Sequence, residues 1–173
     1  RHVRDAVTTN ASTTVTSATA SFTSADVGKV VYGGTVSTPN AVPIGTVVSV
    51  TNATTIVVSV AATGNLTNVD LVVGTDDTAA CASAFNAAKS SSPKGVLFVP
   101  TGGYIVKQRV FDNTYSTPQD GVSVIGNGSG STTFYPAPDF SFTGLGGSGG
   151  MLFHSNNNAN DCTFSGFYVF GAN

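Results

Sequence analysis

The stretch Gly74–Val106, GTDDTAACASAFNAAKSSSPKGVLFVPTGGYIV, decides how this chain is expected to fold. Cys81, Ala84, Phe85 and Ala88 recur at i, i+3, i+4 and i+7, which predicts a short helix with one narrow apolar face. A Ser/Pro-rich break, an apolar run, a Gly-rich turn and a second apolar run follow. The stretch therefore predicts one helix and then two strands.

Local signals mark the ends of these elements. Asp77 or Asp76 can cap the helix, because a short carboxylate accepts hydrogen bonds from the first free backbone N–H groups. Ser90–Pro93 ends the helix, and Val96–Pro100 and Tyr104–Val106 are the two strands. A catalytic carboxylate pair or a calcium site is the alternative for the two aspartates. Adjacent side chains at a helix start diverge and no further acid lies nearby in sequence, so we interpret the pair as capping.

The composition indicates a mostly β chain. Charged residues make up 9% of the sequence, against about 25% in an ordinary soluble domain. Glutamate, a strong helix former, does not occur, and Thr and Val are abundant.

Charge and hydropathy argue against two classes of partner. The net charge is −2 and the cationic residues are scattered, so we expect no nucleic-acid binding. Apolar runs such as Val96–Val99 and Phe167–Phe170 are far too short to span a bilayer, so we expect no membrane insertion. We expect no signal peptide within these residues.

Residues 1–73 show strand patterns and no helical pattern. Asn52 is expected in the turn of a hairpin, and Gly28 in a tight turn that needs a positive φ. The expected strands are Val15–Thr19, Val30–Tyr32, Gly45–Val50, Thr55–Val60 and Val69–Val73.

Residues 74–173 continue with short strands separated by Gly/Asn/Ser-rich turns of uneven length. The expected strands are Val122–Ile125, Thr132–Tyr135, Met151–His154 and Thr163–Phe170. A solenoid produces this pattern, because each coil can carry a different loop on one face.

Three segments resemble a known fold. Gly74–Val106 resembles the entry to the right-handed parallel β-helix of the pectate-lyase-like superfamily and of bacteriophage tailspikes. The segment VSVIGNGSGSTTFYP resembles a coil of that family, with Gly126, Gly128 and Thr132 in matching places, and Asn160–Phe167 resembles a later coil. The resemblance implies that the helix closes one end of a solenoid.

The resemblance also implies a function. We expect the N-terminal part of a phage tailspike or tail-fibre-like protein, located in the virion and extracellular. Residues 1–73 would form a small β-sandwich or barrel-like domain that attaches to other virion proteins; its SFTSADVGKVV segment resembles modules that precede β-helices in phage tail proteins. Residues 74–173 would form the capping helix and first coils. Such spikes are homotrimers, and further coils beyond Asn173 would contact host polysaccharide.

Two alternatives stay open. One is an extracellular polysaccharide lyase or hydrolase with the same fold, whose active site lies beyond this chain; paired acids on neighbouring coils would favour it. The other is a bacterial surface adhesin. No catalytic, cofactor-binding or metal-binding residue is assigned, no cofactor is expected, and we expect these residues alone to have no activity.

Several candidate residues have simpler interpretations. His154 lacks an assignable acid or nucleophile partner, so we interpret it as a polar strand end. Lys107 and Arg109 alternate along a strand and are interpreted as rim contacts or solubilising groups. Strand-like residues follow Gly126–Gly130, which argues against a dinucleotide loop, and Gly144–Gly150 lacks the Lys-Ser/Thr of a P-loop.

The cysteines and aromatic residues each leave two interpretations. Cys81 and Cys162 are either small buried side chains or a disulfide that links the helix to the solenoid. Aromatic side chains either pack in the core, which we favour, or stack on sugar rings. The candidates are Tyr32, Tyr104, Tyr115, Tyr135 and Phe140.

Overall fold

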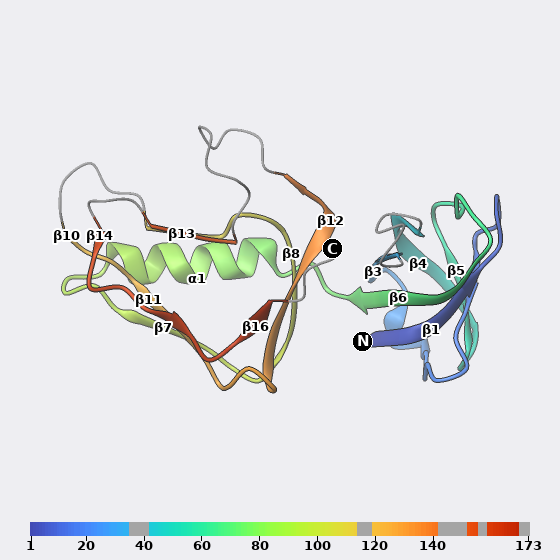
Figure 1. Cartoon of the computed structure of the whole chain (residues 1–173), viewed down its shortest axis with the longest axis horizontal. Helices are drawn as coiled ribbons and strands as arrows, with labels where there is room; N and C mark the ends of the chain where they lie inside the picture. Colours follow the sequence, from blue (N-terminus) through green and yellow to red (C-terminus); the bar gives the residue numbers. More distant parts are fainter. Residues whose placement is uncertain (35–41, 114–118, 142–151, 156–158, 170–173) are drawn as a thin grey trace. The chain divides into compact units, whose positions relative to one another are not determined.

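The computed structural model describes residues 1–34, 42–113, 119–141, 152–155 and 159–169. Within these ranges the chain is mostly β and contains one α-helix, as the composition predicts (Figure 1). The chain folds as two compact units, the first consisting mainly of Arg1–Thr75 and the second of Asp76–Pro136 and Phe140–Phe170.

The first unit is a small closed barrel of six antiparallel strands in the order β1-β2-β5-β4-β3-β6, with β6 pairing back to β1. Its elements are β1 (His2–Thr8), β2 (Thr14–Thr16), a 3-10 turn at Ser24–Asp26, β3 (Val30–Gly34), β4 (Val42–Asn52), β5 (Thr55–Val58) and β6 (Leu66–Gly74). Closure leaves the barrel without a free sheet edge among the described strands.

Small aliphatic side chains fill the barrel. Val15, Val31, Ile56 and Leu71 are fully buried, and Phe22 is the aromatic member of the cluster. Alternation along each strand produces this core, because successive side chains point to opposite faces. The expected hairpin is confirmed between β4 and β5, where Asn52 Oδ1 accepts a hydrogen bond from the backbone N–H of Thr54 at 2.9 Å.

One buried carboxylate of the barrel, Asp26, pairs with two cationic side chains. Asp26 accepts hydrogen bonds from Arg1 Nη1 at 2.8 Å, Lys29 Nζ at 2.7 Å and the backbone N–H of Thr23 at 2.9 Å. Burial alone would raise the pKa of Asp26, but these three donors lower it to about 2. Next to this cluster, Gly28 has the positive φ expected of its turn, 83°.

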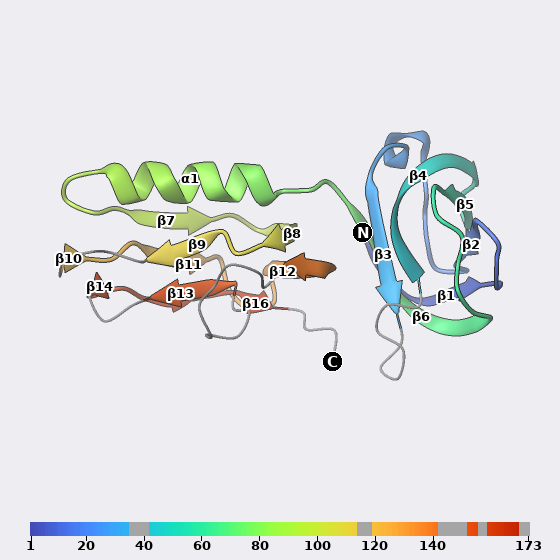
Figure 2. The same cartoon turned by 90° about the horizontal axis from the view of Figure 1, so that it is seen from above.

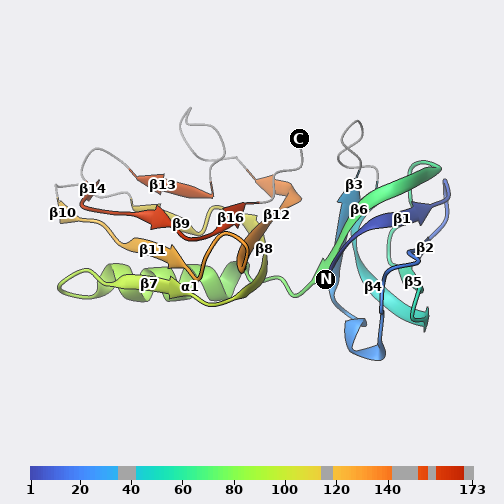
Figure 3. The same cartoon turned by 60° about the horizontal axis from the view of Figure 1, so that its bottom comes forward.

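The second unit consists of α1 and short strands that pair in parallel. They are α1 (Thr78–Ser90), β7 (Val96–Val99), β8 (Gly102–Gln108), β9 (Phe111–Asn113), β10 (Gln119–Asp120), β11 (Ser123–Gly126), β12 (Thr132–Ser141), β13 (Phe153–Ser155), β14 (Ala159–Asn160), β15 (Phe164–Ser165) and β16 (Tyr168–Val169). The ladders are β7-β11-β15, β8-β12-β16, β9-β13 and β10-β14. Strands that recur in the same order along the chain thus stack on one another (Figure 3).

Helix α1 covers the first strands of these ladders. It contacts β7, β8 and β9, and lies at the opposite end of the stack from β13, β14 and β16 (Figure 2). Phe85 of α1 is buried against Phe111 of β9, with ring centroids 5.7 Å apart. The helix ends at Ser90, where the sequence predicts.

An aromatic stack forms the core of the second unit. Phe153 stacks on Phe111 with centroids 4.9 Å apart, and on Phe167 with centroids 4.5 Å apart. Phe134 meets all three rings edge-on. Buried Asn113 links successive turns of the chain, because its amide donates to Val122 O and accepts from Val122 N–H.

The strand predictions are wrong in two ways. The predicted strands do not include β1, β9, β10 and β14, three of which are only two or three residues long. It also treated Thr163–Phe170 as one strand, whereas Gly166 adopts a φ of 73° and separates β15 from β16. This glycine contacts Gly126 closely: a Cβ on Gly126 would lie 2.3 Å from Gly166 O.

Candidate functional site

A pocket of about 170 Å³ opens between α1, β7 and β8 of the second unit. Most of its wall is apolar, and the polar side chains that reach it belong to Asp77, Cys81 and Tyr104. The lining residues are Asp77, Ala80, Cys81, Ala84, Leu97, Phe98, Val99, Pro100, Tyr104 and Phe111.

Small helix residues leave the space for this pocket. The predicted apolar face of α1 carries Cys81, Ala84 and Ala88 beside one large side chain, Phe85. Phe85 is buried in the core, whereas Ala84 is exposed and lines the pocket. Side chains as short as alanine do not fill the distance to β7, so a hollow remains at the first turns of the helix.

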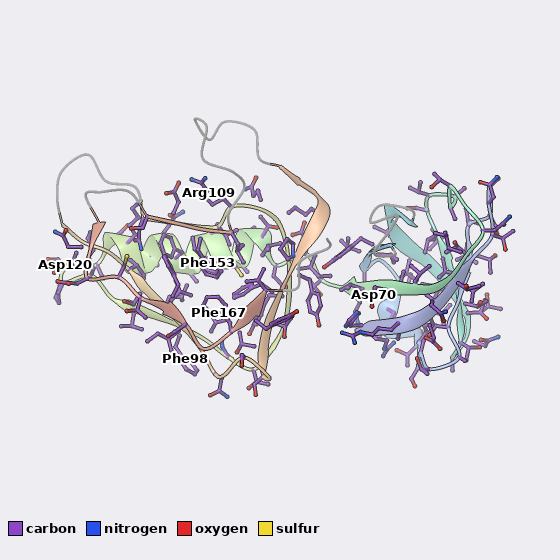
Figure 4. All side chains as sticks on the ribbon, viewed as in Figure 1. Asp70, Phe98, Arg109, Asp120, Phe153 and Phe167 are labelled. Atoms are coloured by element: carbon purple, nitrogen blue, oxygen red, sulfur yellow. The ribbon has the colours of Figure 1, made fainter. Side chains whose placement is uncertain are left out.

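Among the residues that the structure describes, strand β7 supplies the most exposed aromatic ring. Alternation puts Val99 in the core and turns Val96 and Phe98 outward, with Phe98 56% exposed. Figure 4 shows Phe98 on the outer side of the strands, away from Phe153 and Phe167 inside. An aromatic ring of this exposure beside an apolar pocket is available to a ligand.

Asp77 joins the helix to β8. Its backbone N–H donates to Ile105 O at 2.8 Å, and its Oδ2 accepts from the backbone N–H of Ile105 at 3.1 Å. Burial raises the pKa of Asp77, the Ile105 hydrogen bond opposes this, and the charge of Asp76 adds to the rise.

The capping prediction is correct for one of its two candidates. Asp77 occupies the N-cap position but its side chain makes no capping hydrogen bond. Asp76 Oδ1 instead accepts from the backbone N–H of Thr78 at 3.1 Å, and Asp76 Oδ2 lies 3.3 Å from Lys107 Nζ. The two carboxylates therefore have separate structural partners and do not converge on one point.

Burial disfavours the thiolate form of Cys81 in the pocket. Burial, with a smaller contribution from the charge of Asp77, raises the pKa of Cys81 to about 11. Cys81 and Cys162 are both free and half-buried, which excludes the disulfide alternative. Tyr104 donates its hydroxyl hydrogen to Pro100 O at 3.0 Å, so it contributes chiefly its ring to the pocket.

The lining of this pocket suits the binding of an apolar group. A protonated thiol and a carboxylate that accepts a backbone hydrogen bond form no nucleophile–base pair. Apolar walls and the exposed Phe98 ring suit the C–H face of a sugar or another flat apolar group. Phe98 was not among the predicted site residues, because Val96-Leu97-Phe98-Val99 is apolar throughout and does not indicate which face of the strand is outer.

The other candidates divide into three groups. The segment after β11 turns through Gly126–Gly130 into strand β12, which confirms that it is no dinucleotide loop. Tyr32 is buried, as the core interpretation predicts. The side chain of Arg109 is 7% exposed, so the rim interpretation of Arg109 is wrong. Tyr115, Gly144–Gly150 and the side chains of Phe140 and His154 lie outside the described residues.

Among the residues that the structure describes, no three His, Cys, Asp or Glu side chains gather into a metal-binding group. The same residues include no helix long and apolar enough to cross a membrane. Comparison of the chain with protein-family models, with curated proteins and with solved structures found no match.

Proposed function

We propose that this chain is a structural and adhesive virion protein, the N-terminal part of a phage tailspike or tail-fibre-like protein. In this proposal the barrel attaches to other virion proteins. The second unit is the start of a right-handed parallel β-helix, and the surface of this β-helix binds host polysaccharide. The assembly is a homotrimer.

The stacked ladders support the β-helix. Four sets of parallel strands repeat in chain order, and α1 covers the first turn of the chain, where the tailspike resemblance puts a capping helix. The register Val96↔Ser123, Val124↔Phe164 and Phe111↔Phe153 aligns equivalent positions of successive turns. Such in-register stacking builds the elongated bodies of solenoid proteins.

The observation that carries the adhesive function is the apolar pocket with Phe98 exposed at its side. Apolar pockets lined by a few polar groups are common ligand sites, and exposed aromatic rings suit sugar faces. The alternative, a polysaccharide lyase or hydrolase, has no specific observation in its favour among the described residues, where Asp76 and Asp77 hold structural partners.

Two experiments test the proposal. Immunogold labelling with an antibody to this chain should decorate phage tails; labelling confined to bacterial surfaces would favour the bacterial adhesin. The purified chain, incubated with a panel of bacterial capsular and O-antigen polysaccharides, should bind at least one without releasing reducing or unsaturated ends. Release of such ends would overturn the non-enzymatic assignment.

A further inference from the structure

The apolar pocket beside Phe98 contains one hydrogen-bond acceptor that the described part of the chain leaves unused. Asp77 lines the pocket, and its Oδ2 accepts from the backbone N–H of Ile105 at 3.1 Å. Within the described residues, Asp77 Oδ1 accepts no hydrogen bond and the carboxylate forms no ion pair. Burial and then the charge of Asp77 raise the pKa of Cys81, another lining residue, so the carboxylate lies close to the pocket wall.

The lining side chains offer a ligand little else for hydrogen bonding. Tyr104 already donates its hydroxyl hydrogen to Pro100 O at 3.0 Å, and the S–H of Cys81 is a weak donor. The other lining side chains are aliphatic or aromatic. Several sugar hydroxyls buried here would lose more hydrogen bonds to water than one carboxylate oxygen replaces. The pocket therefore suits a group that combines an apolar part with a single hydrogen-bond donor.

An acetamido group has this combination on one edge. A secondary amide is planar and trans, so its N–H lies on the same side as its methyl group, and its carbonyl oxygen lies on the opposite side. The methyl edge can enter the pocket while the carbonyl oxygen stays in water. The volume of the pocket, about 170 Å³, is sufficient, because an apolar cavity of this size holds a benzene molecule.

We propose that the pocket binds the acetamido group of an N-acetylated amino sugar, with the methyl group against the apolar wall and the N–H donating to Asp77 Oδ1. The exposed ring of Phe98 then contacts the C–H face of the same sugar. This inference rests on the proposed glycan-binding function and names the class of sugar. An unsubstituted hexose has neither the methyl group nor the amide N–H, and an O-acetyl ester has the methyl group alone.

The test titrates the whole chain, followed by NMR, with the methyl glycosides of N-acetylglucosamine and N-acetylgalactosamine and with those of glucose and galactose. At least one N-acetylated sugar should shift the signals of Ala80 and Ala84 saturably, and its parent hexose should bind roughly tenfold more weakly. The 2-O-acetyl ester of that hexose should have an intermediate affinity. Equal binding of an N-acetylated sugar and its parent, or no shift of the pocket signals with either N-acetylated sugar, would overturn the proposal.

Two pairs of variants locate the binding. Ala84→Leu fills the pocket and should weaken binding of the N-acetylated sugar roughly tenfold or more, whereas Ala87→Leu, at an exposed position of the same helix outside the pocket, should not. Asp77→Asn keeps an oxygen for the Ile105 N–H but loses the charge, and should weaken binding roughly fivefold. Asp76→Asn, which removes a charge outside the pocket, is its control. Equal affinities within the leucine pair would contradict the proposal even if Asp77→Asn does not fold.

Two further outcomes separate this inference from the proposed function. If the chain binds a polysaccharide and chemical removal of the N-acetyl groups leaves the affinity unchanged, the inference is wrong and the adhesive function stands. If the N-acetylated sugar shifts the pocket signals but the chain binds no bacterial surface polysaccharide, the inference stands and the adhesive function is wrong.

Discussion

The two units of this chain hold their strands together in opposite ways. In the barrel, six antiparallel strands close on themselves around small aliphatic side chains. In the second unit, parallel strands stack turn on turn around phenylalanine rings, and in the described part of the chain β15 and β16 each pair with one strand only. A closed sheet is complete within one unit, whereas a parallel stack can be extended by further strands.

This difference predicts where each unit is vulnerable. The barrel distributes its core over many small side chains, so that no single one dominates. The stack concentrates its core in a few rings that contact one another across successive turns. Substitutions in the two cores test this difference.

The largest effect is expected at Phe111, which contacts Phe85, Phe134 and Phe153. Phe111→Ala should lower the free energy of unfolding of the second unit by about 3–5 kcal/mol. Denaturant unfolding, monitored by hydrogen exchange separately in each unit, measures this loss of stability. Val15→Ala in the barrel is the comparison and should cost less; an equal or larger loss would contradict the view that the stack is the more concentrated core.

The contact between Gly126 and Gly166 should tolerate no side chain. Gly126→Ala would put a Cβ 2.3 Å from a backbone oxygen of the next turn and should destabilise the second unit by about 3 kcal/mol. Gly130→Ala is the matched control, because a Cβ there meets no atom within 4 Å. If both variants unfold at the same denaturant concentration, the turns do not pack as closely as described.

The barrel should be sensitive to acid through Asp26. Its pKa is about 2 when folded, against an ordinary value of 3.8, so its stabilising contribution is complete above pH 4 and is lost as the pH falls toward 2. The expected loss is about 2 kcal/mol. Urea unfolding of the barrel between pH 4 and pH 2 measures it, and Asp26→Asn should flatten this part of the pH profile.

The smallest effect is expected at the start of α1. Asp76→Ala removes the hydrogen bond to the Thr78 N–H and the ion pair with Lys107, and should cost about 1 kcal/mol. Lys107→Met removes only the ion pair and should cost less, because a half-exposed pair contributes little. If thermal unfolding shows the same loss of stability for both variants, the hydrogen bond from the Thr78 N–H to Asp76 does not contribute to stability.

The sequence predicted the features that depend on local chemistry. The helix, its end at Ser90, the hairpin at Asn52 and the turn at Gly28 follow from side-chain periodicity, caps and backbone preferences. Strands of two or three residues, such as β10 and β14, are too short to show a side-chain periodicity. They form because they pair with strands of neighbouring turns of the chain, which the local sequence does not reveal.

The candidate site residues were harder to predict than the local elements, because their positions also depend on contacts between residues that are distant in sequence. Nothing local separates Arg109 from an exposed cation, since its burial depends on how the chain closes between β8 and β9. The role of Asp77 depends on pairing with Ile105, which is distant in sequence. Phe98 carried no usable local signal either, because every residue of β7 is apolar and only packing decides which face is outer.

The most direct test of the account measures whether the pocket beside Phe98 binds glycan. Phe98→Ala and Tyr168→Ala remove aromatic rings of similar exposure, 56% and 51%, but only Phe98 lines the pocket. On a polysaccharide that the unmodified chain binds, Phe98→Ala should weaken binding roughly tenfold and Tyr168→Ala should leave it nearly unchanged. Equal affinities for the two variants, or binding to no surface polysaccharide, would contradict the account.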